Sequence, residues 1–137
     1  MTFRLWQALT LAMGLMAATP ASGVACSCEI AGPPCEAAWK SDAVFAGTVR
    51  SVVEIDHDAY ERPYGSRLVT VDVERAFANA ATGPLELITG RGGGDCGYQF
   101  AVGQRYLIYA TKTPTGHWHA STCSRTRPIE KAQEDLQ

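Results

Sequence analysis

The stretch Val69-Thr70-Val71-Asp72-Val73-Glu74 has a valine at every second position and a polar side chain after each valine. Because successive side chains of a β-strand point to opposite faces, this alternation predicts a strand with one face in a core and one in solvent. Valine is also β-branched and favours extended backbone. The stretch therefore predicts a β-sheet containing a half-buried strand at this place.

Four further segments have strand character. The longest is residues 43–55, which is rich in valine and contains Gly47, a glycine that predicts a bulge or bend. Shorter strands are expected at residues 85–89, 106–111 and 117–122, with turns or loops at 56–65, 79–84 and 90–97. Five short strands in one small chain predict a mostly antiparallel β barrel.

Short helices are expected at the two ends of this domain. Residues 33–40 open with two prolines, which suit the first turn of a helix, and Ser41 and Asp42 end it. Residues 128–137 favour a short C-terminal helix. The predicted fold class is thus mostly β, a five-stranded barrel with a short helix before it and another after it.

The first 25 residues have the pattern of a secretory signal peptide. Arg4 supplies the positive charge, residues 9–18 are apolar, and Gly23-Val24-Ala25 forms a small-x-small cleavage site. The apolar run is shorter than the roughly 20 residues that cross a bilayer. We therefore expect residues 1–25 to be removed and residues 26–137 to form one secreted or periplasmic domain without a membrane span.

Charge and cysteine content narrow the class of protein. The formal net charge is -2 and the basic residues are scattered, so no nucleic-acid-binding surface is expected. All the cysteines follow the expected cleavage site, and in an oxidising compartment they predict disulfides with one cysteine left over. The five cysteines are Cys26, Cys28, Cys35, Cys96 and Cys123. Several disulfide connectivities are open among them.

Cleavage after Ala25 would give a specialised N-terminus. It would place an α-amine, a carbonyl and two sulfurs within Cys26-Ser27-Cys28. Cleavage after Gly23 fits the small-residue rule almost as well and would turn that amine into an amide. Lipidation of Cys26 is a third fate, although the usual lipidation signal has leucine where this chain has Gly23.

Three cysteine-bearing segments resemble the tissue inhibitors of metalloproteinases. Cys26-Ser27-Cys28, followed by Cys35, resembles the Cys-x-Cys start of that family with its third cysteine shortly after. Residues 95–98 (Asp-Cys-Gly-Tyr) resemble the family's Cys-Gly-Tyr segment, and residues 121–124 (Ser-Thr-Cys-Ser) resemble its Thr-Thr-Cys-Ser segment. The likeness covers most of residues 26–124.

The resemblance implies an OB-type barrel with the N-terminal segment tied across it. It also implies the disulfides Cys26–Cys96 and Cys28–Cys123. The family pairs its third cysteine with one near the end of the domain, but no cysteine follows Cys123 here. Cys35 is then unpaired, paired between two chains, or a buried small hydrophobic residue, and we favour the buried position.

The function that the resemblance implies is inhibition of a zinc metalloprotease. The amine and carbonyl of Cys26 would chelate the protease's zinc, and Ser27 would enter the pocket beside it. Cys28 and the edge around Gly94 and Asp95 would support this contact. Such a protein is not an enzyme, is a monomer, and needs no metal or cofactor of its own. The alternative is an exported, disulfide-stapled structural or interaction domain without inhibitory activity.

Other patterns favour simpler interpretations. His117 and His119 share one face of the expected fifth strand and could bind a metal, but we favour an exposed polar face opposite a buried Trp118. A redox or copper-binding pair at Cys26 and Cys28 lacks the Cys-x-x-Cys spacing. The glycine-rich run 90–95 lacks the Lys-Ser/Thr ending of a phosphate loop. No serine–histidine or paired-carboxylate pattern of an enzyme is recognisable.

Overall fold

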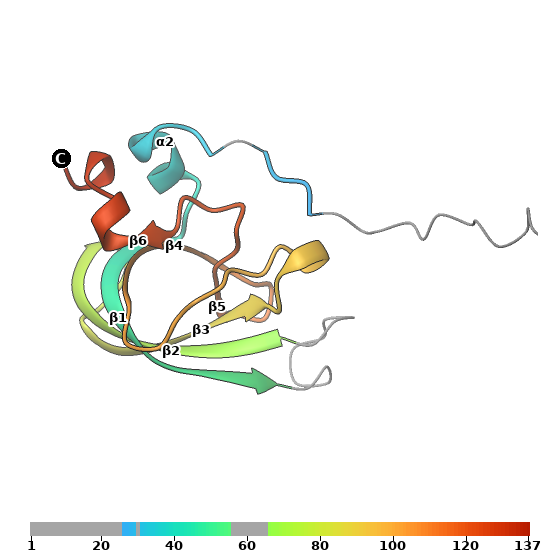
Figure 1. Ribbon diagram of the computed structural model, residues 1–137. Helices are drawn as coiled ribbons and strands as arrows, with labels where there is room; N and C mark the ends of the chain where they lie inside the picture. The colour runs from blue at the N-terminus through green and yellow to red at the C-terminus, as the bar shows by residue number, and fades with distance from the viewer. Residues whose placement is uncertain (1–25, 30, 56–65) are drawn as a thin grey trace, which may run out of the picture.

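The computed structural model describes residues 26–29, 31–55 and 66–137, and this part of the chain is mostly β (Figure 1). The predicted signal peptide and the predicted loop at 56–65 lie outside the described residues. The strands are β1 Ala43–Ile55, β2 Ser66–Ala78, β3 Gly83–Gly90, β4 Arg105–Lys112, β5 Trp118–His119 and β6 Arg127–Pro128. The helical elements are α2 Pro34–Trp39 and the 3-10 turns η3 Gly93–Asp95, η4 Ile129–Lys131 and η5 Glu134–Leu136.

The strands belong to one sheet with a closed ring in it. Their order is β1-β2-β3-β5-β4-β6, and β1 also pairs with β4, so β1, β2, β3, β5 and β4 form a ring of five strands. The neighbours are antiparallel except for β3 and β5, which are parallel over two residue pairs. The prediction of a mostly β, mostly antiparallel protein is confirmed.

The first half of β1 and the middle of β4 are buried on both faces, which explains their continuous apolar sequence. Phe45 and Ile108 point into the core inside the ring, whereas Val44, Leu107 and Tyr109 belong to a second cluster. That second cluster also contains Ala37 of α2 and Ala132 near the C-terminus. The ends of the domain therefore cover the outer face of β1 and β4 (Figure 1).

β1 begins and ends where the sequence predicts, and one of its three register shifts against β2 falls at the predicted glycine. The pairing with β2 shifts register between Ala46 and Gly47. A side chain at position 47 would collide with the main chain of Asp72 and with Val71 on β2. Gly47 is therefore required because two backbones approach closely at the bulge.

Two of the predicted elements differ in the structure. β5 is only two residues long, because the chain then turns so that Ser121 bridges Gly97 in the β3–β4 connection. Trp118 and Ala120 nevertheless pack on the inner core, as their spacing predicts. The predicted C-terminal helix takes the form of two separate 3-10 turns, η4 and η5, and residues 127–128 before them add β6 to β4.

Among the described residues, no helix is both long enough and apolar enough to cross a membrane.

Candidate functional site: the N-terminal cysteine segment

Two disulfides fasten residues 26–28 across two distant connections of the sheet. Cys26 is bonded to Cys96 at the end of η3, with Cα atoms 5.1 Å apart and a sequence separation of 70 residues. Cys28 is bonded to Cys123 after β5, with Cα atoms 5.0 Å apart and a separation of 95 residues. These are the two pairings that the resemblance implies. The three-residue segment is therefore held by one bridge at each of its ends.

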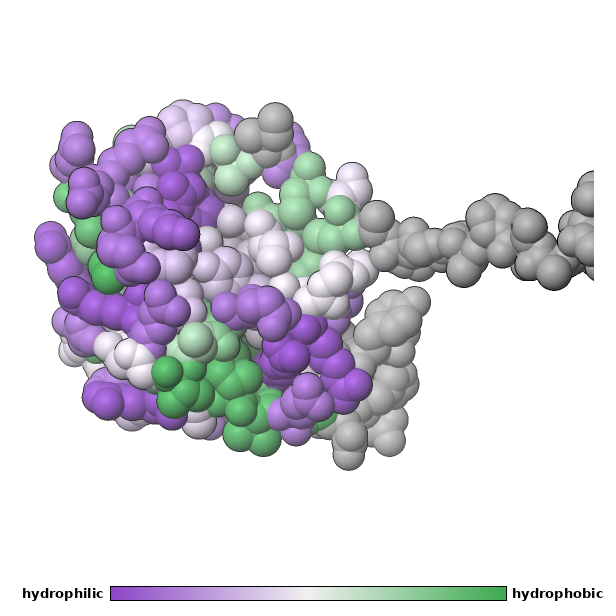
Figure 2. Space-filling view, viewed as in Figure 1, coloured by the Kyte–Doolittle hydropathy of each residue, from purple (hydrophilic) through white to green (hydrophobic). Residues whose placement is uncertain are grey.

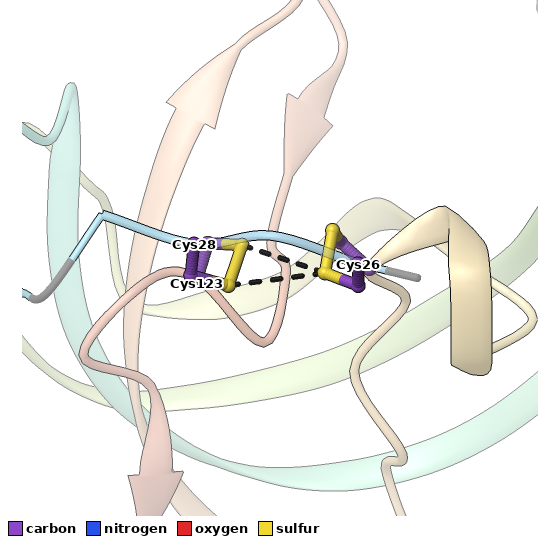
Figure 3. A group of neighbouring side chains, drawn as sticks. Cys26, Cys28 and Cys123 are labelled. Carbon is purple, nitrogen blue, oxygen red and sulfur yellow. Dashed lines mark hydrogen bonds between the residues drawn. A yellow bond between two sulfur atoms is a disulfide. The ribbon is translucent and has the colours of Figure 1, made fainter. Parts of the chain in front are cut away.

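The two bridges lie side by side (Figure 3). Cys26 Sγ is 3.8 Å from Cys28 Sγ and 3.7 Å from Cys123 Sγ. The connections that carry Cys96 and Cys123 are themselves joined, because the Thr122 amide donates to the Cys96 carbonyl at 2.9 Å. The Thr122 hydroxyl donates to the same oxygen at 3.2 Å. The segment thus rests on a rigid base made by two loops.

The main chain of the segment is open to a partner. Ser27, Cys28 and Glu29 are exposed, and Cys26 is half-buried. Within the part of the chain that the structure describes, no main-chain hydrogen bond joins Ser27, Cys28 or Glu29 to another main-chain group. In the space-filling view, the surface where the segment emerges is pale and weakly hydrophobic, whereas much of the rest of this face is hydrophilic (Figure 2). An exposed, extended and anchored segment is suited to docking into a cleft.

The glycine-rich connection beside the segment is organised by Asp95. Its carboxylate accepts hydrogen bonds from the amides of Arg91 at 2.6 Å, Gly92 at 2.8 Å and Gly97 at 2.9 Å. The loop also needs close backbone contact, since a side chain at position 97 would overlap with the main chain of Gly90. Gly94 is exposed at the tip of η3. The carboxylate of Asp95 therefore supports the segment through the shape of its own loop.

A pocket of about 280 Å³ lies next to the segment. It is bounded by Glu29, Ala31 and Gly32, by the end of α2, by β4, and by the loop that carries Cys123. Arg125 lies in its wall and donates a hydrogen bond to the carbonyl of Gly32 at 3.1 Å. This contact fixes the chain a few residues after the cysteines, so the segment is held on both sides of Glu29.

The C-terminus holds Arg125 in place through a buried carboxylate. The side chain of Asp135 is fully buried and is paired with Arg125, whose side chain is only 9% exposed. Asp135 also accepts a hydrogen bond from the Tyr109 hydroxyl at 2.7 Å and lies 3.7 Å from Arg127. Burial by itself raises the pKa of Asp135, but the hydrogen bonds from Arg125 and Tyr109 and the nearby positive charges outweigh it, so this pKa is lowered. Burial and the bond to Asp135 raise the pKa of Tyr109.

Other candidate residues fall outside this site. Cys35 is not in a disulfide, as expected, but the favoured buried position is wrong: it is exposed on α2, because Ala37 is the helix residue that faces the core. In the described part of the chain, the only cluster of three or more residues with metal-ligand side chains is the four-cysteine group, so His117 and His119 belong to none.

The sequence did not indicate Arg125, Asp135 or Thr122 as supports of the segment. Arg125 contacts Gly32 and Thr122 contacts Cys96, and both of these partners lie in distant parts of the chain. The one available signal was the Arg-Thr-Arg run at 125–127 close to the acidic residues 134–135.

A comparison with protein-family models finds no match for this chain, and a comparison with curated proteins finds none either.

Proposed function

We propose that the protein is an exported inhibitor-like binding protein for a zinc metalloprotease. Its ring of five strands would be an OB-type barrel, and the mature chain would begin at Cys26. The observation that carries the proposal is the segment Cys26-Ser27-Cys28, which is anchored by two adjacent disulfides and has Ser27 and Cys28 exposed; among the described residues its main chain has no main-chain hydrogen-bond partner. The resemblance of the cysteine-bearing segments to the tissue inhibitors of metalloproteinases supplies the chemistry.

The chemistry requires a free amine on Cys26. A catalytic zinc has three protein ligands and an open position for water or substrate. The α-amine and the carbonyl oxygen of Cys26 would occupy this position and close a five-membered ring with the metal. An α-amine has an ordinary pKa of about 7.7–8.0, so the neutral, donating form costs little free energy near neutral pH.

The surroundings of the segment favour this contact. Binding of a flexible tripeptide would lose conformational entropy, whereas a segment held by two disulfides has already lost most of it. The exposed side chain of Ser27 lies between the two anchors and would enter the protease pocket next to the zinc. The loop with Gly94 and Asp95, shaped by the hydrogen bonds of the Asp95 carboxylate, would form the supporting edge.

A second candidate function is an exported structural or interaction domain in which the disulfides act only as staples. Two observations favour it. The disulfides join the N-terminal segment to two loops of the same domain, and the Asp95 carboxylate accepts hydrogen bonds within its own loop. The two candidates differ in one respect that an assay can detect: only the inhibitor requires Cys26 to be the first residue.

The test compares the native exported protein with a variant that has one alanine inserted before Cys26. A control variant has the alanine added after Gln137, so that its N-terminus is native. Intact mass first establishes that the native chain begins at Cys26. We expect the native and control proteins to inhibit zinc metalloproteases, with no effect on a serine protease, and the N-terminal insertion to abolish inhibition. Equal inhibition by all forms, or none by any, would refute the chelation mechanism.

A further inference from the structure

The four disulfide-bonded cysteines bring their sulfur atoms into one small cluster. All four Sγ atoms lie within 4.8 Å of one another. The distances from Cys26 Sγ to Cys28 Sγ and to Cys123 Sγ, 3.8 and 3.7 Å, join atoms of different bridges (Figure 3). The two-residue spacing of Cys26 and Cys28 brings the bridges together at one end, and the hydrogen bonds from Thr122 to the Cys96 carbonyl bring them together at the other.

These separations match the geometry of a four-thiolate zinc site. Zinc binds thiolate sulfur at about 2.3 Å in a tetrahedral arrangement, which places neighbouring sulfurs about 3.8 Å apart. The two contacts between the bridges already have this length. The bonded pairs would separate after reduction by rotation of the cysteine side chains, while the Cα atoms start 5.1 and 5.0 Å apart.

We propose that the reduced protein binds one Zn²⁺ through Cys26, Cys28, Cys96 and Cys123. The cluster then has two states, a pair of disulfides or one zinc tetrathiolate. In the reduction, each disulfide takes up two electrons and two protons and becomes two thiols, while a dithiol reductant becomes a disulfide. Zn²⁺ then displaces four protons to solvent and forms four Zn–S bonds. This site does not depend on the proposed protease contact.

The surroundings of the cluster allow both steps. Cys28 is exposed and the other three cysteines are half-buried, so a reductant and a metal ion have access. The Thr122 hydroxyl lies 3.7 Å from Cys26 Sγ, where it could turn to donate to a thiolate. Soft thiolate ligands select zinc or copper(I) over magnesium or calcium. The metal state would keep residues 26–28 fastened to the same two loops before the disulfides form or after they are reduced.

The experiment titrates the mature protein with Co²⁺, a spectroscopic substitute for Zn²⁺. The disulfides are first reduced without oxygen by a phosphine, which is oxidised to its oxide as each bridge becomes two thiols. We expect one Co²⁺ per chain, with the strong visible absorption of a tetrahedral thiolate complex, and its displacement by one Zn²⁺. A weak octahedral spectrum, or no binding because the reduced chain does not assemble the site, would overturn the proposal.

Two further measurements distinguish this site from other thiol chemistry. Cys35→Ser is the matched control and should bind Co²⁺ as the native protein does, whereas Cys28→Ser and Cys123→Ser should lose the four-sulfur spectrum. Alkylation followed by mass spectrometry is an independent readout. With Zn²⁺ present, a single label should enter the reduced native protein, at Cys35. Labelling of all five cysteines, or loss of the site in Cys35→Ser, would contradict the four-cysteine assignment.

Discussion

Removing the two disulfides should have a non-additive effect on stability, because both bridges connect the segment 26–28 to the part of the chain between residues 96 and 123. The separations of 70 and 95 residues, taken separately, correspond to loop-closure terms of about 4.4 and 4.7 kcal/mol. With one bridge intact, however, the other closes a shorter circuit that runs from residue 26 to 28, through the intact bridge, and from 96 to 123. That circuit has about 30 residues, so its closure contributes about 3.6 kcal/mol.

The expected result is a difference between single and combined removal. Replacing Cys26 and Cys96 with serine, or Cys28 and Cys123, should lower the free energy of unfolding by about 3.6 kcal/mol in either case. Replacing all four should lower it by about 8 kcal/mol, roughly 1 kcal/mol more than the sum of the two. A domain of this size has a total stability of about 5–15 kcal/mol, so the last variant is close to unfolding.

The assay is guanidinium unfolding followed by tryptophan fluorescence, with every variant made in a Cys35→Ser background to prevent disulfide exchange. A fixed concentration of sucrose keeps the four-serine variant folded enough to measure. Losses below about 1 kcal/mol for a single bridge would show that chain entropy is not how the bridges stabilise the fold. A combined loss equal to or smaller than the sum would refute the shared-circuit argument.

Two further predictions concern the supports of the segment. Asp135→Asn removes the carboxylate from a buried pair with Arg125 and should cost about 3 kcal/mol of stability, measured by urea unfolding at neutral pH. Folding lowers the pKa of Asp135, so the ionised carboxylate stabilises the folded state. This stabilisation is complete at a pH above the ordinary aspartate pKa of about 3.9 and disappears as the pH falls through the folded pKa. The stability of the native protein should therefore decrease more steeply in acid than that of the variant. Gly97→Ala places a methyl group against the main chain of Gly90 and should lower stability by about 1–3 kcal/mol in the same assay, and an unchanged midpoint would show that the glycine-rich loop is not tightly packed.

Much of the fold was predictable because its signals are local. The alternation of valines at 69–73 predicted a strand, and β2 contains it. β1 has the predicted bounds, Ala43–Ile55, because β-branched residues and the surrounding turns mark a strand without reference to distant partners. The two-residue β5 and the 3-10 turns at the C-terminus were not predictable, because pairing with Gly97 and burial of Ala132 decide them.

The candidate site also has features that the sequence predicts and features that it does not. The Cys-x-Cys start and the other cysteine-bearing segments were visible in the sequence, and the disulfides pair as their family resemblance implies. The exposure of Cys35 was decided by which face of α2 contacts the core.

The sequence by itself therefore determined the four longer strands, the bulge at Gly47 and the residues that carry the bridges. Only the tertiary structure decided that the two bridges touch, that the Asp95 carboxylate is used within its loop, and that a buried Asp135 fixes Arg125 against Gly32. The physical reason is distance along the chain. Strand periodicity is a property of neighbouring residues, whereas a charge can be buried only where partners from remote segments meet it.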